Sequence, residues 1–517
     1  MKIQMSLSLT FLLTICIVFP HVHSSLNTTG DLNWWCNQTP NPNPCNYHTS
    51  HIPESASATN ISRKQFLTIA EQTALDAVIS ELGYIKSLEP RVINDGERAA
   101  WSDCLLFYNL TINSLSKILN VTTKSTAADI QVWLTAASTS ILTCQDGFSD
   151  VNVTTNIYPL VISNNVTQLI KNCLSLNMVF FDQEKGHMQK GVSKFFPPNN
   201  SLFENADCVV AQDGSGDYTT ITEALEASKN RQDVSQRFVI QVKQGTYAEY
   251  PVVTDDMKNI VLVGDGIDNT IVTGNQRAGA NLTLTDTATF QVYGDGFVAK
   301  DITFENTAGV DAGQAIALYS QADQSAFYLC GFRGYQDTLM AAMNRQFYRE
   351  CKIYGTVDYI FGNAAVVFQQ STIFASKPDG GLVITAQART DSEHASGTVI
   401  QNCSIVAGPD LLSKGTTYLG RPWRDYSTVV IMQSFLDSIV NPEGWLEWPG
   451  AGSTRDSTVF YAEFDNTGPG SATDGRVNWP GYHVITDSSD VKQYSVANFI
   501  DGESWLPNTG VPFDSGI

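Results

Sequence analysis

Two glutamines and two aspartates recur in the second half of the chain at nearly one interval. Gln314 and Gln336 are 22 residues apart, and Asp337 and Asp358 are 21 residues apart. If the backbone returns to the same place at that interval, these side chains stack in neighbouring columns about 4.8 Å apart. Two carboxyls that close do not ionise independently, so one can remain a proton donor while the other attacks as a nucleophile. The alternative is a solvated ladder of polar side chains, which is common on solenoid surfaces.

The stretch YQDTL, residues 335–339, places two of these side chains next to each other. In a regular strand, neighbouring side chains point to opposite faces. Gln336 and Asp337 can therefore face one site only if the strand ends or bends there, and we expect irregular backbone at this position.

A loose repeat provides the element that would bring the four residues together. After Asp207, short apolar stretches alternate with Gly, Asn and Asp; Cys330 and Cys351 lie 21 residues apart, and Ser371 follows 20 residues later. Such repeats are too short for a strand–helix–strand crossover, so they favour a parallel β-solenoid of stacked coils. A β-sandwich is the alternative, but it does not explain the interval. The repeated stretches are FVAKDITFENT, FYLCGFRGY, FYRECKIYG, VFQQSTIFA and VIQNCSIVA.

The first half has a different periodicity. From Ile61 to about Phe180, apolar residues recur at intervals of three and four, in runs ending near Ile85, near Leu119, over 126–148 and over 157–180. This pattern predicts an antiparallel bundle of four helices. We expect the helical domain over 28–183, a linker over 184–205, where Pro, Gly and Asn lack periodicity, and the β domain over 206–517.

The N-terminus and the overall charge indicate a secreted protein. Lys2 precedes an apolar run from Leu7 to Phe19, with a cleavage position after Ser24, so residues 1–24 are predicted to be a signal peptide. A membrane anchor is the alternative, but the run is shorter than the roughly 20 apolar residues of a membrane span. The formal charge of −21 disfavours nucleic acid as a partner.

Asn-x-Ser/Thr sequons and cysteines agree with secretion. Eight of the ten sequons lie before residue 200, which suggests a glycosylated N-terminal half. A Cys36–Cys45 disulfide would staple an N-terminal hairpin and Cys104–Cys144 would tie two helices, with buried free thiols as the alternative. The chain has no Cys-x-x-Cys pair, which disfavours zinc, and no Gly-x-Ser-x-Gly elbow. The sequons are at Asn27, Asn37, Asn60, Asn109, Asn120, Asn152, Asn165, Asn199, Asn281 and Asn402.

Several stretches resemble known families. Residues 206–517 resemble plant pectin methylesterases, and residues 28–180 resemble the invertase/pectin methylesterase inhibitor family, most clearly in DIQVWLTAASTSILTCQDGF at 129–148. The motifs in the second half are GTYAE, LVGDG, GDGFVAKDITFENTAG, QAIAL, GYQDTL, GTVDYIFGNAAVVF, LGRPW, GWLEW and NTGPG.

The resemblance implies a right-handed parallel β-helix that removes methyl esters from homogalacturonan, releasing methanol. It implies that Asp358 is the nucleophile and that Asp337 is the acid that protonates the methoxide, and then the base that activates water. No metal and no organic cofactor is implied.

The same resemblance assigns the supporting residues. Gln314 and Gln336 would donate N–H groups to the oxyanion, and Arg421 would keep Asp358 ionised. Trp423 would line the sugar site. Phe361 and Trp445 could do the same, or could be buried in the core.

The chain also departs from the family pattern, mainly at the rim of the site. Residues 340–343 read Met-Ala-Ala-Met, Ala312–Gly313 replaces a Lys-His pair, and Leu329 replaces an arginine. Thr283-Leu284-Thr285 replaces a Thr-Thr-Phe stretch. With the acidic charge, these changes predict an altered pattern or rate on charged pectin. Ser371 replaces a cysteine, which leaves Cys403 unpaired, and Cys330–Cys351 is expected to bridge adjacent coils.

The inhibitor-like half is expected to occupy the esterase site or to assist secretion. Its removal would need a cut in the linker, but no dibasic pair lies in 181–206, so a site near Lys190 or Lys194 is the alternative. We expect a monomer in the cell wall, with methylated homogalacturonan and a covalently attached or separate inhibitor as partners. The competing functions are a binding protein without turnover, and a β-helical lyase or polygalacturonase.

Overall fold

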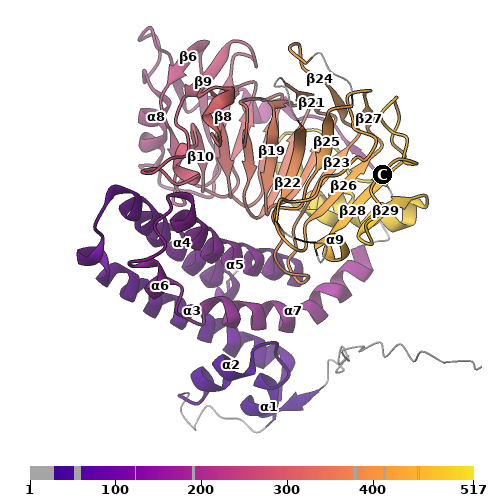
Figure 1. Cartoon of the computed structure of the whole chain (residues 1–517). Helices are drawn as coiled ribbons and strands as arrows, with labels where there is room; N and C mark the ends of the chain where they lie inside the picture. The colour runs from indigo at the N-terminus through magenta and orange to yellow at the C-terminus, as the bar shows by residue number, and fades with distance from the viewer. Residues whose placement is uncertain are drawn as a thin grey trace, which may run out of the picture.

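The computed structural model describes residues 28–51, 60–122, 124–188, 193–376, 381–411, 415–450, 452 and 455–517. Figure 1 shows a layer of helices beneath a stack of β-coils. The predicted signal peptide, residues 1–24, and the sequon at Asn27 lie outside the described residues. No helix in the described ranges is both long and apolar enough to cross a membrane.

Long antiparallel helices build the first half, as the apolar periodicity predicts. Three of them begin at a polar cap: Ser62 exchanges bonds with Gln65, Thr126 exchanges bonds with Asp129, and Asn94 accepts from a backbone N–H. The helices are α3 (Arg63–Ser87), α4 (Asp95–Leu119), α5 (Ala127–Asp150) and α7 (Val166–Met188), with the short α1 (Leu32–Cys36), α2 (Pro42–Thr49) and α6 (Tyr158–Val161) and the strand pair β1 (Thr29–Gly30) and β2 (Ile61–Ser62).

The run predicted as one helix over 157–180 is divided in two. The Asn164 side chain donates to the Val161 carbonyl at the end of α6 and accepts from the Val166 N–H at the start of α7. Helix α7 then continues to Met188, five residues into the segment predicted as linker. The periodicity missed the break because the apolar residues continue through it.

Disulfides tie the helical domain together. Cys36–Cys45 joins α1 to α2, and Cys104–Cys144 joins α4 to α5. Cys173 is a buried free thiol in α7.

The second half is a parallel β-helix of long sheets. The sheet that faces the bundle has the spatial order β25-β22-β19-β16-β13-β10-β7. Its strands are β7 (Val252–Val253), β10 (Phe290–Val292), β13 (Leu318–Ser320), β16 (Leu339–Ala341), β19 (Val357–Gly362), β22 (Leu382–Gln387) and β25 (Thr417–Gly420).

A second sheet follows each strand of the first around the coil. It contains β4 (Cys208–Val210), β5 (Phe238–Val242), β8 (Ile260–Gly264), β11 (Val298–Lys300), β14 (Ser325–Tyr328), β17 (Arg345–Arg349), β20 (Ala365–Gln369), β23 (Gly397–Gln401), β26 (Thr428–Met432), β28 (Phe460–Phe464) and β29 (Tyr482–Ile485).

A third sheet closes the coil. It contains β6 (Gly245–Ala248), β9 (Thr270–Gly274), β12 (Thr303–Asn306), β15 (Gly331–Arg333), β18 (Lys352–Gly355), β21 (Thr372–Ala375), β24 (Ser404–Ala407) and β27 (Phe435–Leu436). The short helices of this half are α8 (Ile221–Ser228), α9 (Arg455–Thr458), α10 (Ser488–Val491), α11 (Val496–Phe499) and α12 (Gly502–Trp505). Buried residues of α10, α11 and α12 pack against the outer face of the second sheet.

The register confirms the predicted interval in the middle of the stack. Leu318 pairs with Leu339, and Leu339 pairs with Ile360, a step of 21 residues each time. Other coils are longer, because loops interrupt them: Phe290 pairs with Leu318, 28 residues on. The solenoid is therefore correct, and the sandwich alternative is wrong.

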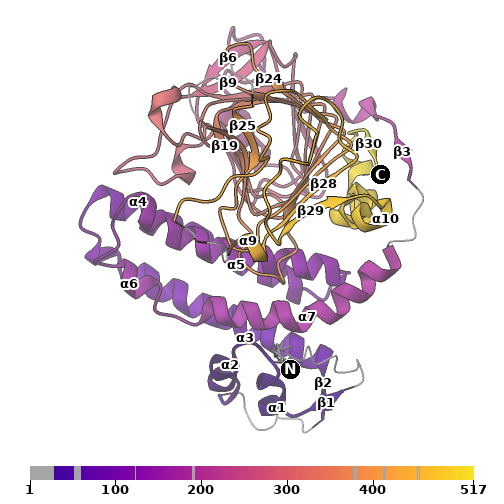
Figure 2. The same cartoon turned by 45° about the vertical axis from the view of Figure 1, so that its right-hand side comes forward.

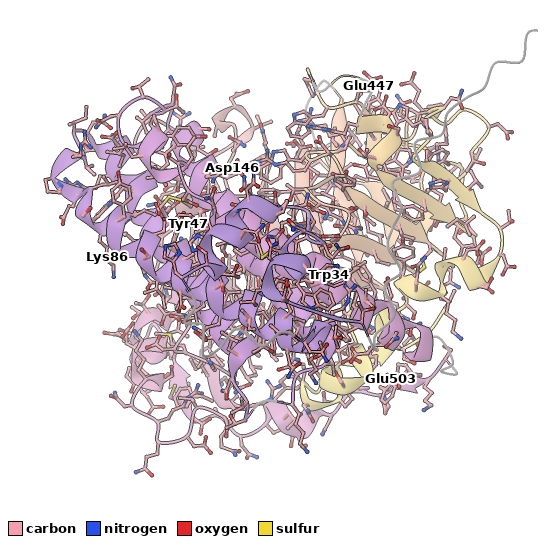
Figure 3. All side chains as sticks on the ribbon, turned by 90° about the horizontal axis from the view of Figure 1, so that it is seen from below. Trp34, Tyr47, Lys86, Asp146, Glu447 and Glu503 are labelled. Atoms are coloured by element: carbon pink, nitrogen blue, oxygen red, sulfur yellow. A yellow bond between two sulfur atoms is a disulfide. The ribbon has the colours of Figure 1, made fainter. Side chains whose placement is uncertain are left out.

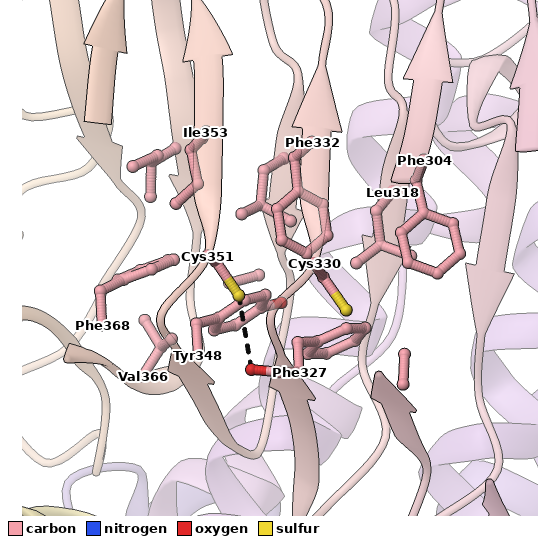
Figure 4. Packing of buried hydrophobic residues seen from close by; sticks show 14 of the residues in the cluster. Phe304, Leu318, Phe327, Cys330, Phe332, Tyr348, Cys351, Ile353, Val366 and Phe368 are labelled. Carbon is pink, nitrogen blue, oxygen red and sulfur yellow. Dashed lines mark hydrogen bonds between the residues drawn. The ribbon is translucent and has the colours of Figure 1, made fainter. Parts of the chain in front are cut away.

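The predicted Cys330–Cys351 disulfide is wrong. Both residues are buried free thiols inside the coil, and each Sγ lies 3.4 Å from a backbone carbonyl oxygen. Figure 4 marks the contact between Cys351 and the carbonyl of Phe327. A disulfide needs β-carbons about 3.5–4.5 Å apart, whereas side chains in register on parallel strands stay about 4.8 Å apart. Cys403 is also a free thiol, as expected, and its Sγ accepts a bond from the Ser371 N–H.

The bundle lies along the first sheet, with α4 and α5 between that sheet and the outer helices α3 and α7 (Figure 2). Seen from below, the helices lie in front of the β-strands (Figure 3). Apolar side chains of the helices and of the outer sheet face form one buried cluster. The cluster includes, on the β-helix side, Leu284, Ala288, Tyr293, Ile316, Tyr319, Met340, Ala342, Met343, Phe361 and Ala386.

The segment after the bundle is attached to the end of the chain. Strand β3 (Phe195–Phe196) pairs antiparallel with β30 (Phe513–Asp514), and the rings of Phe196 and Phe513 stack at 4.3 Å. Lys194, one of the expected cleavage positions, accepts from the Ser515 N–H with its carbonyl and donates its own N–H to the Ser515 hydroxyl.

Candidate active site

Strand ends of the bundle-facing sheet position the polar residues predicted from the sequence. Gln314 lies just before β13, Asp337 just before β16, and Asp358 within β19. Because Leu339 pairs with Ile360, Asp337 and Asp358 occupy equivalent positions on adjacent coils. The Asp337 N–H donates to the Val357 carbonyl at 3.0 Å, which joins the two coils at this level.

The backbone is irregular at Asp337, as YQDTL predicts, and also at Asp358, where no irregularity was predicted. Asp337 has φ 62° and Asp358 has φ 53°, and the register of β19 shifts between Val357 and Ile360. Aspartate tolerates the left-handed region better than most residues. The turn interrupts the alternation of inward-facing and outward-facing side chains. Asp337, two residues before the inward-facing Leu339, can therefore face outward.

Arg421 holds Asp358 through both carboxylate oxygens. Its Nε donates to Oδ1 at 2.9 Å and its Nη2 donates to Oδ2 at 2.6 Å. This fork geometry orients the carboxylate as well as stabilising its charge. Burial nevertheless raises the pKa of Asp358 more than Arg421 lowers it.

Asp337 is the carboxyl with the environment of a proton donor. It is 3% exposed, and its Oδ2 accepts from Gln314 Nε2 at 2.9 Å. Burial raises the pKa of Asp337 well above its ordinary value, and the Asp358 carboxyl raises it further, while Gln314 and Arg421 lower it. The two carboxyls thus differ in their partners: Asp358 is bound by the guanidinium of Arg421, whereas Asp337 is bound by the neutral amide of Gln314.

A cavity of about 240 Å³ contains Gln314 and both aspartates. Trp423 and Phe361 also line it, and their rings are 6.0 Å apart. The structure thus places Phe361 at the site, whereas Trp445 is buried in the core. Gln336 is half-buried beside the cavity, and its carbonyl accepts from the Ala315 N–H.

Comparison with known proteins identifies the two halves. The pectinesterase family model matches residues 207–503, and the plant invertase/pectin methylesterase inhibitor model matches residues 31–176. The chain belongs to the pectinesterase family. As a member of that family it is an enzyme that removes methyl esters from pectin, and it carries an inhibitor-like domain at its N-terminus.

Individual relatives are similar to this chain in sequence or in structure. Pectinesterase 2 of Citrus sinensis is 44% identical over 99% of this chain and 100% of its own length. Pectinesterase/pectinesterase inhibitor PPE8B of Prunus persica is 42% identical over 80% of this chain and 82% of its own. The structure of pectin methylesterase from carrot matches 61% of this chain and 99% of its own, with 45% identity and a TM-score of 0.59.

Sequence reasoning missed an aromatic side chain of the esterase domain. The Trp448 ring lies 4.6 Å from the guanidinium carbon of Arg421, so it covers the residue that holds Asp358. Trp448 also lines the cavity. Its motif, GWLEW, was noticed, but only Trp445 was considered for the site.

The inhibitor-like domain itself lines the cavity, which sequence reasoning did not predict at the level of residues. Asp146, Ser149 and Asp150 come from the last turn of α5. The Leu284 N–H donates to Asp150 Oδ2 at 3.2 Å, and burial raises the pKa of Asp150 to about 6. A carboxylate of the bundle therefore lies beside the catalytic candidates.

Several of the residues that depart from the family pattern contact the bundle. Met340, Ala342 and Met343 are buried in the shared apolar cluster, and the Ser140 hydroxyl lies 3.3 Å from Met343 Sδ. Ala341 points into the coil instead. Thr283 donates to Asp103 of α4 at 2.6 Å. Met340, Ala342 and Met343 thus belong to an apolar surface that this chain's own helices cover, whereas Leu329 packs in a separate cluster on the outer face of the second sheet.

Proposed function

We propose that Asp358 and Asp337 carry out the ester hydrolysis on methylated homogalacturonan. Asp358 attacks the ester carbonyl, and the N–H groups of Gln314 and Gln336 stabilise the oxyanion. Asp337 gives its proton to the departing methoxide, which leaves as methanol. It then takes a proton from the water that releases the acid product from Asp358.

The observation that carries this proposal is that two neighbouring carboxyls, Asp358 and Asp337, have different hydrogen-bond partners. Arg421 binds one of them through two charged hydrogen bonds, while the other is buried against a neutral amide. A nucleophile must be ionised and an acid must be protonated, so these environments support the two roles. Trp423 and Phe361 offer apolar surface for the sugar rings.

We further propose that the helical domain inhibits its own esterase. Helix α5 covers the outer face of the sheet, and polar contacts join the two domains along its length. Trp133 Nε1 donates to Asp323 at 2.8 Å, Arg345 donates to Asp129 at 2.7 Å, and Asn363 donates to Thr139 at 2.8 Å. A pectin chain cannot reach Asp337 while these helices remain in place.

The protein is proposed to act outside the cell, in the cell wall. The signal-like N-terminus, the sequons and the disulfides of the bundle support secretion and glycosylation. A cut near Lys190 would release the bundle, whereas a cut after Lys194 would first require β3 to leave β30. A monomer is sufficient, because one chain supplies both the site and its cover.

The test is methanol release and polymer length with highly methylated pectin. The intact secreted chain is compared with a chain cleaved at a protease site inserted between Met188 and Ser193, each with and without Asp358→Ala. We expect methanol without chain shortening, more after cleavage, and none with the variant. Shortening without methanol would indicate a lyase or a polygalacturonase. Binding without methanol from either form would indicate the alternative, a binding protein that has lost turnover.

A further inference from the structure

Arg424 is a cation of the esterase domain whose carboxylate partner belongs to the other domain. Its Nη2 lies 2.7 Å from both carboxylate oxygens of Asp146, in α5. Arg424 lines the same cavity as Asp337 and Asp358, and its guanidinium lies 5.2 Å from the ring of its neighbour Trp423. Asp146 is labelled in the view of the bundle in Figure 3.

Other arginines near the site are neutralised within the esterase domain. Arg421 is bound to Asp358, and Arg455 is bound to Asp425. For Arg424, the carboxylate contacted among the described residues is that of Asp146. Departure of the bundle would therefore leave this guanidinium without its carboxylate, beside the catalytic candidates.

The backbone of the loop that carries Arg424 is bonded within the esterase domain. Arg455 Nη1 donates to the carbonyls of Pro422 and Trp423, at 2.9 and 3.1 Å. The Arg424 N–H donates to the Ser427 hydroxyl at 3.3 Å. None of these bonds involves the bundle, so the loop keeps its shape when the helices leave and Arg424 stays at the cavity.

We propose that Arg424 is a specificity residue that binds a free uronate carboxylate of the pectin chain, at a sugar near the ester being hydrolysed. Asp146 occupies the position of that carboxylate while the bundle is docked. This inference rests on the proposed function, and it names which part of the polymer the site prefers.

The chemistry of the polymer makes the distinction possible. A methyl ester is neutral, whereas each hydrolysed sugar carries a carboxylate, which a guanidinium can bind with two hydrogen bonds. Trp423 presents an aromatic surface next to that position. The formal charge of −21 repels a polyanion. A cation at the site would offset this repulsion locally. The enzyme would therefore work faster next to sugars that have already lost their methyl groups.

The test compares two variants that break the same ion pair from opposite sides. Both Arg424→Gln and Asp146→Asn loosen the docked bundle, so both raise methanol release by the intact chain. Each is assayed on a fully methylated oligogalacturonide and on the same oligogalacturonide after partial saponification, and the ratio of the two kcat/KM values is compared. Arg424→Gln should lower the saponified-to-methylated ratio about fivefold, as for a partly exposed ion pair. Asp146→Asn should leave this ratio at the wild-type value. Arg424→Lys, which keeps the positive charge, should lower the ratio only slightly.

A binding measurement separates this inference from the esterase assignment. Fluorescence quenching with unesterified oligogalacturonate should show tighter binding by Asp146→Asn than by the double variant Asp146→Asn/Arg424→Gln. Equal binding, or a ratio that changes equally in both single variants, would overturn the role of Arg424. Absence of methanol from every form would instead overturn the esterase mechanism.

Discussion

Gly96 of α4 packs directly against the backbone carbonyl of Ala280 in the esterase domain. A β-carbon at Gly96 would lie far inside contact distance of the Ala280 oxygen, which belongs to the backbone and cannot rotate away. Gly83 of α3 is also helical, but a β-carbon there meets nothing within 4 Å. An added β-carbon at Gly96 would therefore meet the other domain, whereas one at Gly83 would not.

Gly96→Ala should weaken the docking of the helical bundle on the esterase domain in the uncleaved chain. The added methyl group cannot fit while α4 is docked, although alanine is the better residue inside a helix by about 1 kcal/mol. Methanol release by the uncleaved chain should therefore rise severalfold. Gly83→Ala, inside α3, gains helix propensity in full without the clash, and its methanol release should equal that of wild type. A rise in both variants would show that helix stability, and not docking, controls access to the site.

Arg421→Gln should move the acid side of the pH–rate profile. Removing the guanidinium takes away the interaction that lowers the pKa of Asp358, so the nucleophile ionises only at higher pH. In the Gly96→Ala background, the lower midpoint of kcat/KM should shift upward by about 1 to 3 pH units. Arg333→Gln, whose partner Asp268 lies in the turn between β8 and β9, is the matched control. An unchanged midpoint would remove Arg421 from its proposed role.

Asp337→Asn should abolish most of the turnover with little effect on substrate binding. The amide keeps the size of the carboxyl but has no proton to give to methoxide, and general acid catalysis contributes about 10² to 10⁴ in rate. We expect kcat to fall by that factor with KM nearly constant. Fluorescence binding of methylated oligogalacturonide measures whether the site remains formed. A variant that retains wild-type kcat would exclude Asp337 as the acid.

The stacking of Asp337 and Asp358 could be predicted because it depends only on the length of one coil. An interval of 21 residues places Asp337 and Asp358 on adjacent coils, and the register Leu339–Ile360 reproduces it. Resemblance added Arg421, which lies 63 residues from Asp358 along the chain. The spacing of Cys330 and Cys351 was equally regular. Regular spacing makes their side chains parallel, however, and parallel side chains do not converge into a disulfide.

The contacts between the domains could not be predicted from one sequence. Arg424 and Asp146 are 278 residues apart, and nothing in the local pattern of either segment couples them. Met340 and Met343 could be recognised as departures at a rim, but not as the surface that α5 covers. These positions become meaningful only when both folded domains are placed together.

Docking should weaken as the pH rises. Burial raises the pKa of Asp103 of α4 well above its ordinary value, and Asp286 and Asp150 raise it further, while the Thr283 hydroxyl lowers it. The pKa of Asp150 is raised to about 6. A free aspartate has a pKa near 4, so these groups take up protons when the bundle docks. Docking is favoured most below about pH 4, and the contribution of Asp150 is lost as the pH rises towards 6.

The measurement is the ratio of methanol release by the intact wild-type chain to release by Gly96→Ala, followed from pH 4 to pH 7. We expect the ratio to rise with pH because the wild-type bundle loosens. Asp103→Asn can still accept the bond from Thr283 without taking up a proton, so its ratio should rise less steeply. Asp76→Asn, on α3, is the control and should follow wild type. A ratio that falls with rising pH would mean that ion pairs such as Arg424–Asp146 outweigh the buried acids.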